Sequence, residues 1–363
     1  GRLQIEEPGT VFSLLAAVTL EPEAVDIDVR LVMVGDPEQY HLLLAADPEF
    51  ARHFRVKVDF ADEVPATAAT RRGTAVLVAH TCRRHGLPPF SASAVAALIE
   101  VAQREVDDQA RQSAIFAHTE ALVIEAAVQA GARRGDRVER TDVQAALAAR
   151  TRRHDGPEQR LREAIVEGER LVSTHGSRVG LVNGLSQVDL GDHRFGLPVR
   201  VTARAHAGHE GLLNIEREVK LSGPIHDKGV LILQAYLSSL FSHRAPLALQ
   251  ASLVFEQEYG GIEGDSASCA EFYALLSALS GLPVRQSLAV TGAVSQLGEV
   301  LPVGGLNEKI EGWFRTCEAA GLDGSQGVII PARNRRHLML DAAVRHAVRG
   351  GVFRVHTMGH VLD

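Results

Sequence analysis

The sequence predicts an α+β chain of several domains: an α/β segment, then a helical bundle, then a larger α/β domain. Its length of 363 residues suits two or three domains, and a hydrophobic fraction of 45% can build their cores. The apolar pattern is helical in the middle of the chain and changes to strands from Leu181 onward. The predicted domains are residues 1–64, 65–153 and 154–363.

Composition excludes several classes of protein. A net charge of −7 argues against nucleic-acid binding as the main function. No apolar run is long enough to span a membrane, and no signal peptide is visible. The three cysteines have no metal-ligand spacing, which indicates reduced thiols in a cytoplasmic protein. The chain starts at Gly1 in mid-pattern, so we expect a piece of a longer protein.

The first segment shows two strand-like runs around a helix. Residues 29–34 form an apolar run that ends at Gly35-Asp36, and Pro37 suits the first turn of a helix through Ala46. A short helix follows Asp47-Pro48, and residues 55–60 alternate as a strand does.

The middle segment predicts four helices and a linker. Gly86 ends the first helix and Ser91 caps the second, whereas Gly131 ends the third and Thr141 caps the fourth. The predicted helices cover residues 67–84, the stretch from Ser91, 114–130 and 142–150. We predict a linker at 151–156 and a charged helix at 159–171.

The last segment alternates strands and helices. Strands are predicted at 197–205, 248–256, 286–293, 327–330 and 352–355, with 230–233 either a strand or helical. Helices are predicted after Ser266, around Lys309 and over 334–347. The chain turns at Gly298, and Gly304-Gly305 breaks it before Lys309.

Ser266 lies in the stretch that organises this domain, YGGIEGDSASCAEFYALLSA from Tyr259 to Ala278. Its Gly-rich start leads into a helical pattern, so Ser266 is predicted beside the free N–H groups of a helix start, which can stabilise an oxyanion. The alternative is structural, because Asp265, Ser266 and Ser268 are all good N-caps. Cys269 is interpreted as a small buried residue rather than a nucleophile.

Lys309 lies in a second stretch, LPVGGLNEKIEGW. Only four of the 38 basic residues are lysines, at positions 57, 220, 228 and 309. A buried lysine can lose its proton, whereas an arginine cannot. A neutral Lys309 could therefore accept the proton of Ser266, as in Ser-Lys nucleophile and base pairs.

The sequences EGDSAS and GEVLPVGGLNEKIEG resemble the proteolytic domain of Lon proteases, in particular the archaeal-like branch and its bacterial Lon-related members. The resemblance runs from about Val179 to the C-terminus. It implies that Ser266 is the nucleophile, that Lys309 is the general base and that N–H groups around Asp265 form the oxyanion hole. It places Thr291 where the family has a hydroxyl near the lysine. It further implies a homohexameric ring that degrades unfolded proteins or peptides.

Residues 1–64 resemble the later half of an AAA+ ATPase core, and residues 65–153 resemble its helical lid. The resemblance places Asp36 near sensor 1, Arg52 or Arg55 near the arginine finger, and Arg111 at sensor 2. The alternatives are surface arginines at 52 and 55 and an exposed helical arginine at 111. No GxxxxGK[ST] phosphate loop occurs. We therefore expect no cofactor in this chain, and ATP and Mg²⁺ only in a longer parent protein.

The sequence leaves three other interpretations open. The histidines at 206, 209, 226 and 243 are expected on the surface, with no metal site. The histidines at 337, 346, 356 and 360 could supply a Ser-His-Asp triad in place of Lys309. A non-catalytic ring-forming scaffold with a Lon-like shell is the alternative to an endopeptidase.

Overall fold

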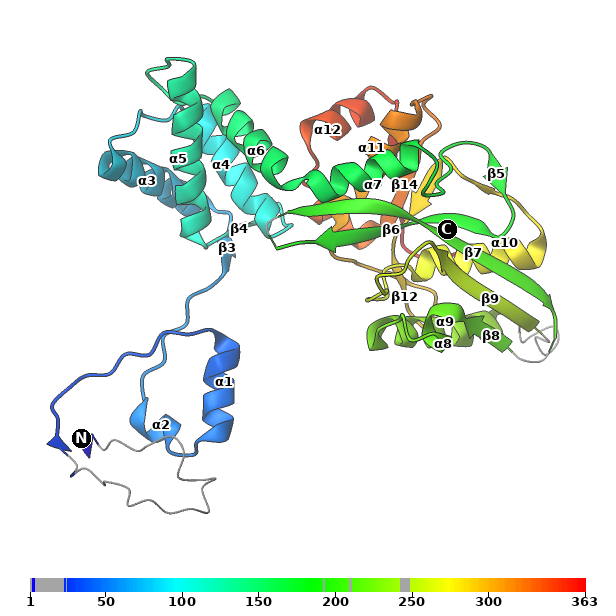
Figure 1. The fold of residues 1–363 in the computed structure, drawn as a ribbon, viewed down its shortest axis with the longest axis horizontal. Coiled ribbons are helices and arrows are strands. Elements are labelled where there is room, and N and C mark those ends of the chain that lie inside the picture. Colours follow the sequence, from blue (N-terminus) through cyan, green and yellow to red (C-terminus); the bar gives the residue numbers. More distant parts are fainter. Residues whose placement is uncertain (1, 4–22, 24, 192, 209–210, 242–248) are drawn as a thin grey trace. The chain divides into compact units, whose positions relative to one another are not determined.

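The computed structural model describes residues 2–3, 23, 25–191, 193–208, 211–241 and 249–363 (Figure 1). The chain forms two compact units, residues 1–60 and residues 61–363. His209 and His243, two of the expected surface histidines, lie outside the described residues.

In its described residues, the first unit contains two short helices and one strand pair. The strands β1 (Arg2–Leu3) and β2 (Val25–Asp26) are antiparallel. The helix α1 (Pro37–Ala46) confirms the prediction, because Asp36 accepts a hydrogen bond from the Gln39 N–H at 2.7 Å and Pro37 occupies the first turn. The short helix α2 covers Phe50–His53.

The two strands predicted in this unit are wrong. Residues 29–34 and 55–60 are irregular, and their apolar side chains are exposed: Val34 by 95% and Phe60 by 91%. A strand satisfies its backbone groups only by pairing with a neighbour, and the described residues give neither run a partner.

The second unit begins with a helical bundle. As the sequence predicts, Ser91 caps the second helix and Gly86 ends the first in a left-handed conformation with φ of 63°. Thr67, predicted as the first residue of the first helix, is its cap. A small β pair joins β3 (Glu63–Pro65) to β4 (Arg111–Ser113). The helices are α3 (Ala68–His85), α4 (Ala92–Glu105), α5 (Phe116–Ala132), α6 (Arg140–His154) and α7 (Gly156–Val166).

Three predicted boundaries in the bundle are wrong. The helix α5 continues through Gly131. The cap of α6 is Glu139 rather than Thr141, in a capping box with Asp142. The predicted linker at 151–156 is helical, since α6 extends to His154 and α7 starts two residues later. Residues 151–156 are polar because this helical stretch lies at the surface, not because the chain is irregular there.

A seven-stranded mixed sheet forms the centre of the remaining chain, in the order β15-β14-β11-β6-β7-β9-β8. Figure 1 shows the long strands β6, β7 and β9 running side by side. The pairs β6–β7 and β7–β9 are antiparallel, and the other four pairs are parallel. The seven strands are β6 (Leu181–Asp189), β7 (Arg194–Ala207), β8 (Gly211–Asn214), β9 (Leu249–Glu256), β11 (Leu288–Val290), β14 (Gly327–Pro331) and β15 (Arg354–Met358).

Helices cover both faces of this sheet. The adjacent residues Ala289 and Val290 of β11 belong to two different cores, as expected when neighbouring side chains point to opposite faces. One core contains α9 (Pro224–Phe241) and α10 (Ser268–Ser280), and the other contains α11 (Leu306–Ala320) and α12 (Ala342–Arg349). The remaining elements are α8 (Ile215–Glu218), the pair β5 (Ser177–Arg178) and β10 (Val284–Arg285), and the pair β12 (Ala293–Val294) and β13 (Val300–Leu301).

Two further predictions in this part need correction. The run 286–293 is divided into β11 and β12. The helix predicted at 334–347 is divided into a 3-10 helix, η1 (Ala332–His337), and α12. The Asn334 side chain bonds both backbone groups of Val303, and Asp341 caps α12. Side chains that bond to the backbone in this way end one helix and start another. Residues 230–233 are helical, inside α9.

Candidate active site

Ser266 lies in a turn two residues before α10 and does not cap it. The N-cap of α10 is Ala267, which makes no side-chain capping bond. Of the three predicted capping residues, Ser268 is the first residue of the helix, and its Oγ donates to the Asp265 carbonyl oxygen at 2.7 Å. The Ser266 hydroxyl is thus free of any capping role, and the structural interpretation of this residue is wrong.

The turn that carries Ser266 is fixed to the end of β11. The Ser266 carbonyl accepts hydrogen bonds from the Gly292 N–H at 2.8 Å and from the Thr291 hydroxyl at 3.2 Å. The Cys269 N–H donates to the Gly292 carbonyl at 3.0 Å. Thr291 is fully buried, and its hydroxyl holds the serine turn. Its expected place near the lysine stays a prediction.

Lys309 lies in the first turn of α11, and its amine reaches Ser266. Gly305 is the N-cap of this helix and has a φ of 62°, which favours glycine. Lys309 is only 4% exposed, and its Nζ donates to Ser266 Oγ at 3.0 Å. The structure thus brings together two residues that are 43 positions apart.

The environment of Lys309 favours a neutral amine. Burial lowers its pKa from 10.5 to about 8, against the opposite effect of the Asp265 and Glu308 carboxylates, which raise it. The positive end of the α11 dipole also disfavours an ammonium group in the first turn. At neutral pH a fraction of about one tenth is therefore deprotonated and able to accept a proton.

Two glycines that the sequence analysis did not single out set the depth of Lys309. A Cβ on Gly196 of β7 would lie 2.6 Å from Lys309 Cα, and a Cβ on Gly312 of α11 would lie 2.9 Å from Gly196 Cα. The helix therefore packs backbone to backbone on the strand. Glycine inside a strand pattern and inside a helix pattern is the sequence signal for such a contact.

The four residues predicted to sense nucleotide have ordinary partners. Asp36 caps α1, Arg52 pairs with Glu49 at 3.0 Å, and the Arg55 Nε donates to the Arg52 carbonyl. Arg111 pairs with Glu63 at 2.6 Å.

The alternative for Arg111, an exposed helical arginine, is wrong, because the residue lies in β4. The β3–β4 pair forms here because two short segments on either side of α3 and α4 meet antiparallel. The roles of these four residues in binding a nucleotide stay predictions.

The histidine interpretations have mixed outcomes. His206 is exposed, as expected. His226 is wrongly placed on the surface: it is 1% exposed and lies 3.2 Å from Glu271, which is buried to the same degree. The position falls inside α9, whose inner face packs on the sheet. Burial lowers the pKa of His226, but the carboxylates of Glu271, Glu216 and Asp227 together raise it, so the net shift is upward.

No histidine bonds Ser266 in the described part of the chain, where the partner of its hydroxyl is Lys309. Cys269 is fully buried, and burial raises the pKa of its thiol. No cluster of three or more metal-ligating side chains occurs among the described residues.

Three family models match successive parts of the chain. Residues 1–61 match a LonB-like AAA domain, and residues 89–153 match the AAA+ ATPase lid domain of archaeal LonB. Residues 260–363 match the C-terminal proteolytic domain of Lon protease (S16), and this range includes both Ser266 and Lys309.

Similar proteins carry Lon names. A protein of Escherichia coli (strain K12) named "Putative Lon protease homolog" is 35% identical over 93% of this chain and 57% of its own length. The homolog of the same name from Haemophilus influenzae is 45% identical over 51% of this chain and 31% of its own length. The archaeal Lon protease of Thermococcus kodakarensis is 29% identical over 96% of this chain and 52% of its own length. The chain thus spans 31% to 57% of the length of these relatives.

The matched domains define the class: a protease module that follows AAA+ elements. Over these ranges the chain is similar to the Lon protease family, in particular to its LonB-like and archaeal members. In the described ranges, no helix has both the length and the apolar character needed to cross a lipid bilayer.

Proposed function

We propose that this chain is a serine-type endopeptidase in which Ser266 is the nucleophile and Lys309 the general base. The observation that carries the proposal is the 3.0 Å hydrogen bond between Lys309 Nζ and Ser266 Oγ, made by a lysine whose pKa is lowered to about 8. A base with a pKa near the working pH transfers protons efficiently in both directions.

The chemistry follows from these two groups. Neutral Lys309 takes the hydroxyl proton as Ser266 Oγ attacks the peptide carbonyl carbon. The negative oxygen of the tetrahedral intermediate is stabilised by the N–H groups of Asp265 and Ser266, neither of which donates to another described residue. As the C–N bond breaks, the Lys309 ammonium returns its proton to the leaving amine. Water then hydrolyses the acyl-enzyme, with Lys309 again as the base.

We extend this proposal to the substrates and the assembly of the protein. The names of the relatives support protein substrates, and we propose unfolded proteins or peptides cleaved in the cytoplasm by a homohexamer. The match to an AAA domain supports ATP dependence in a longer protein, although the chain contains no phosphate loop. The non-catalytic scaffold would require a misplaced lysine or an occluded serine, and no observation favours either.

Turnover of an unstructured protein such as casein tests the proposal. Wild type should cleave it, and Ser266→Ala should not. Removal of a hydroxyl that caps no helix should leave the fold intact. A peptide boronate should bind covalently at Ser266. Attachment at Cys269 or at another serine would refute the assignment, as would full activity of Ser266→Ala.

A further inference from the structure

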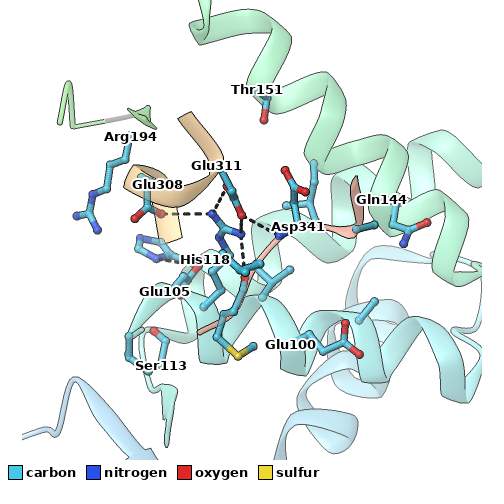
Figure 2. A pocket seen from close by; sticks show the side chains of 18 of the residues that line it. Glu100, Glu105, Ser113, His118, Gln144, Thr151, Arg194, Glu308, Glu311 and Asp341 are labelled. Atoms are coloured by element: carbon cyan, nitrogen blue, oxygen red, sulfur yellow. Dashed lines mark hydrogen bonds and ion pairs between the residues drawn. The ribbon is translucent and has the colours of Figure 1, made fainter. Parts of the chain in front are cut away.

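An ion-pair cluster joins the helical bundle to the helix that carries Lys309. Arg104, near the end of α4, donates to both carboxylate oxygens of Glu311 on α11 at 2.6 and 2.7 Å. It also donates to the Met339 carbonyl at 2.9 Å and reaches Glu308 at 3.4 Å. Figure 2 shows Glu308 and Glu311 facing one cleft, each with dashed lines that lead to a guanidinium between them.

Without Arg104, the negative charges of Glu308 and Glu311 have few positive partners. Glu311 is 5% exposed, and its other partner is the Asp341 backbone N–H at 2.8 Å. One oxygen of Glu308 is buried and accepts no hydrogen bond from a described residue. Arg194 lines the same cleft but pairs with Asp189 at 2.8 Å. Arg104 is therefore the main cation for both carboxylates.

One of these two carboxylates, Glu308, acts on the proposed base. Glu308 precedes Lys309 in α11 and favours its charged form, as does Asp265 from the turn before α10. From β7 the facing residue is Gly196, which has no side chain. The net charge beside Lys309 thus depends on whether Arg104 of the bundle stays paired with the carboxylates of α11.

We propose that Arg104 is a positioning residue through which the helical bundle holds α11 in place and balances the negative charge beside Lys309. The inference rests on the proposed function of Ser266 and Lys309. Withdrawal of Arg104 would leave the Glu308 carboxylate without this cation, so that it stabilises the Lys309 ammonium more strongly. A displacement of the bundle would then switch the base off without any change in the serine.

The test is the pH dependence of kcat/KM for a short fluorogenic peptide, with this chain as it stands. In Arg104→Ala, the midpoint of the rise of kcat/KM with pH should move to higher pH by roughly one unit. Loss of a nearby positive charge raises the lysine pKa by about that much. Activity at pH 7 should fall about tenfold and return near pH 10. Arg104→Lys keeps the positive charge and should keep the midpoint at its wild-type pH. Glu308→Gln should move the midpoint to lower pH.

Arg336→Ala is the matched control. The Arg336 side chain crosses the same interface to Asp108 at 3.0 Å and bonds to His337 rather than to a carboxylate of α11, so its loss should leave the midpoint unchanged. An unmoved midpoint in Arg104→Ala would overturn the inference, even if activity fell. If Arg104→Ala does not fold, Glu308→Gln takes its place as the test. An unmoved midpoint in that variant would also overturn the inference. Failure of the proposed function is distinguishable, since only that would leave Ser266→Ala active.

Discussion

Gly196 of β7 and Gly312 of α11 touch through their backbones, and this contact sets how deeply Lys309 is buried. No other residue type fits at either position, because a Cβ on one glycine would collide with the main chain of the opposite element. The 4% exposure of Lys309, and hence its lowered pKa, follows from this close packing.

Gly196→Ala should therefore damage the site from a distance. The added methyl group should push α11 away, at a cost of about 1–3 kcal/mol in the free energy of unfolding. It should lower kcat at least tenfold, because a displacement of about 1 Å can cost far more than that. Gly304→Ala is the control, since nothing lies within 4 Å of that position. Equal kcat values for the two variants would contradict the packing argument.

Lys309→Arg should be as inactive as Lys309→Ala, because a guanidinium cannot accept the serine proton. In the wild type, kcat/KM should rise with pH through a midpoint near 8, where Lys309 loses its proton. Lys228→Arg, at an exposed position of α9, should keep full activity. Substantial turnover by Lys309→Arg would show that another base is used.

Lys309→Met should make the protein more stable while it abolishes activity. Between pH 8 and 10.5 the unfolded chain keeps a proton that folded Lys309 has lost, so wild-type stability rises with pH across this window. Below pH 8 the buried ammonium costs about 3 kcal/mol, at about 1.4 kcal/mol per pKa unit. At pH 7, Lys309→Met should recover most of this cost as a higher free energy of unfolding.

Urea unfolding followed by Trp313 fluorescence measures this gain. Trp313 is the single tryptophan of the chain and is fully buried in α11. The stability difference between Lys309→Met and the wild type should shrink as the pH rises from 8 to 10.5. A difference that is constant with pH would mean that the ammonium charge carries no cost.

This chain should hydrolyse no ATP and should bind it weakly at best. The phosphates and Mg²⁺ need the backbone, lysine and hydroxyl of a phosphate loop, which the sequence lacks. Arg111 pairs with Glu63, and arginines alone cannot build such a site. Calorimetric titration with ATP and Mg²⁺ measures this. Micromolar affinity, or casein cleavage stimulated by ATP, would contradict the prediction.

Short-range features of the fold were predictable from sequence. The caps at Asp36, Thr67 and Ser91 start helices where expected, because a cap bonds to backbone groups only a few residues away. Ser266 and Lys309 could be singled out as a pair because each lies in a distinctive local pattern. The strands predicted at 29–34 and 55–60 failed because pairing depends on a neighbour that periodicity does not reveal.

Local patterns in the sequence thus predicted the helix starts at Asp36, Thr67 and Ser91, the sheet domain and the two residues proposed for catalysis. How these residues function together depends on tertiary packing. It placed Lys309 Nζ on Ser266 Oγ, buried His226 beside Glu271 and brought Arg104 from the bundle to Glu311. Burial and charge at a residue depend on which distant element packs against it, and the spacing of its neighbours in the chain does not encode that.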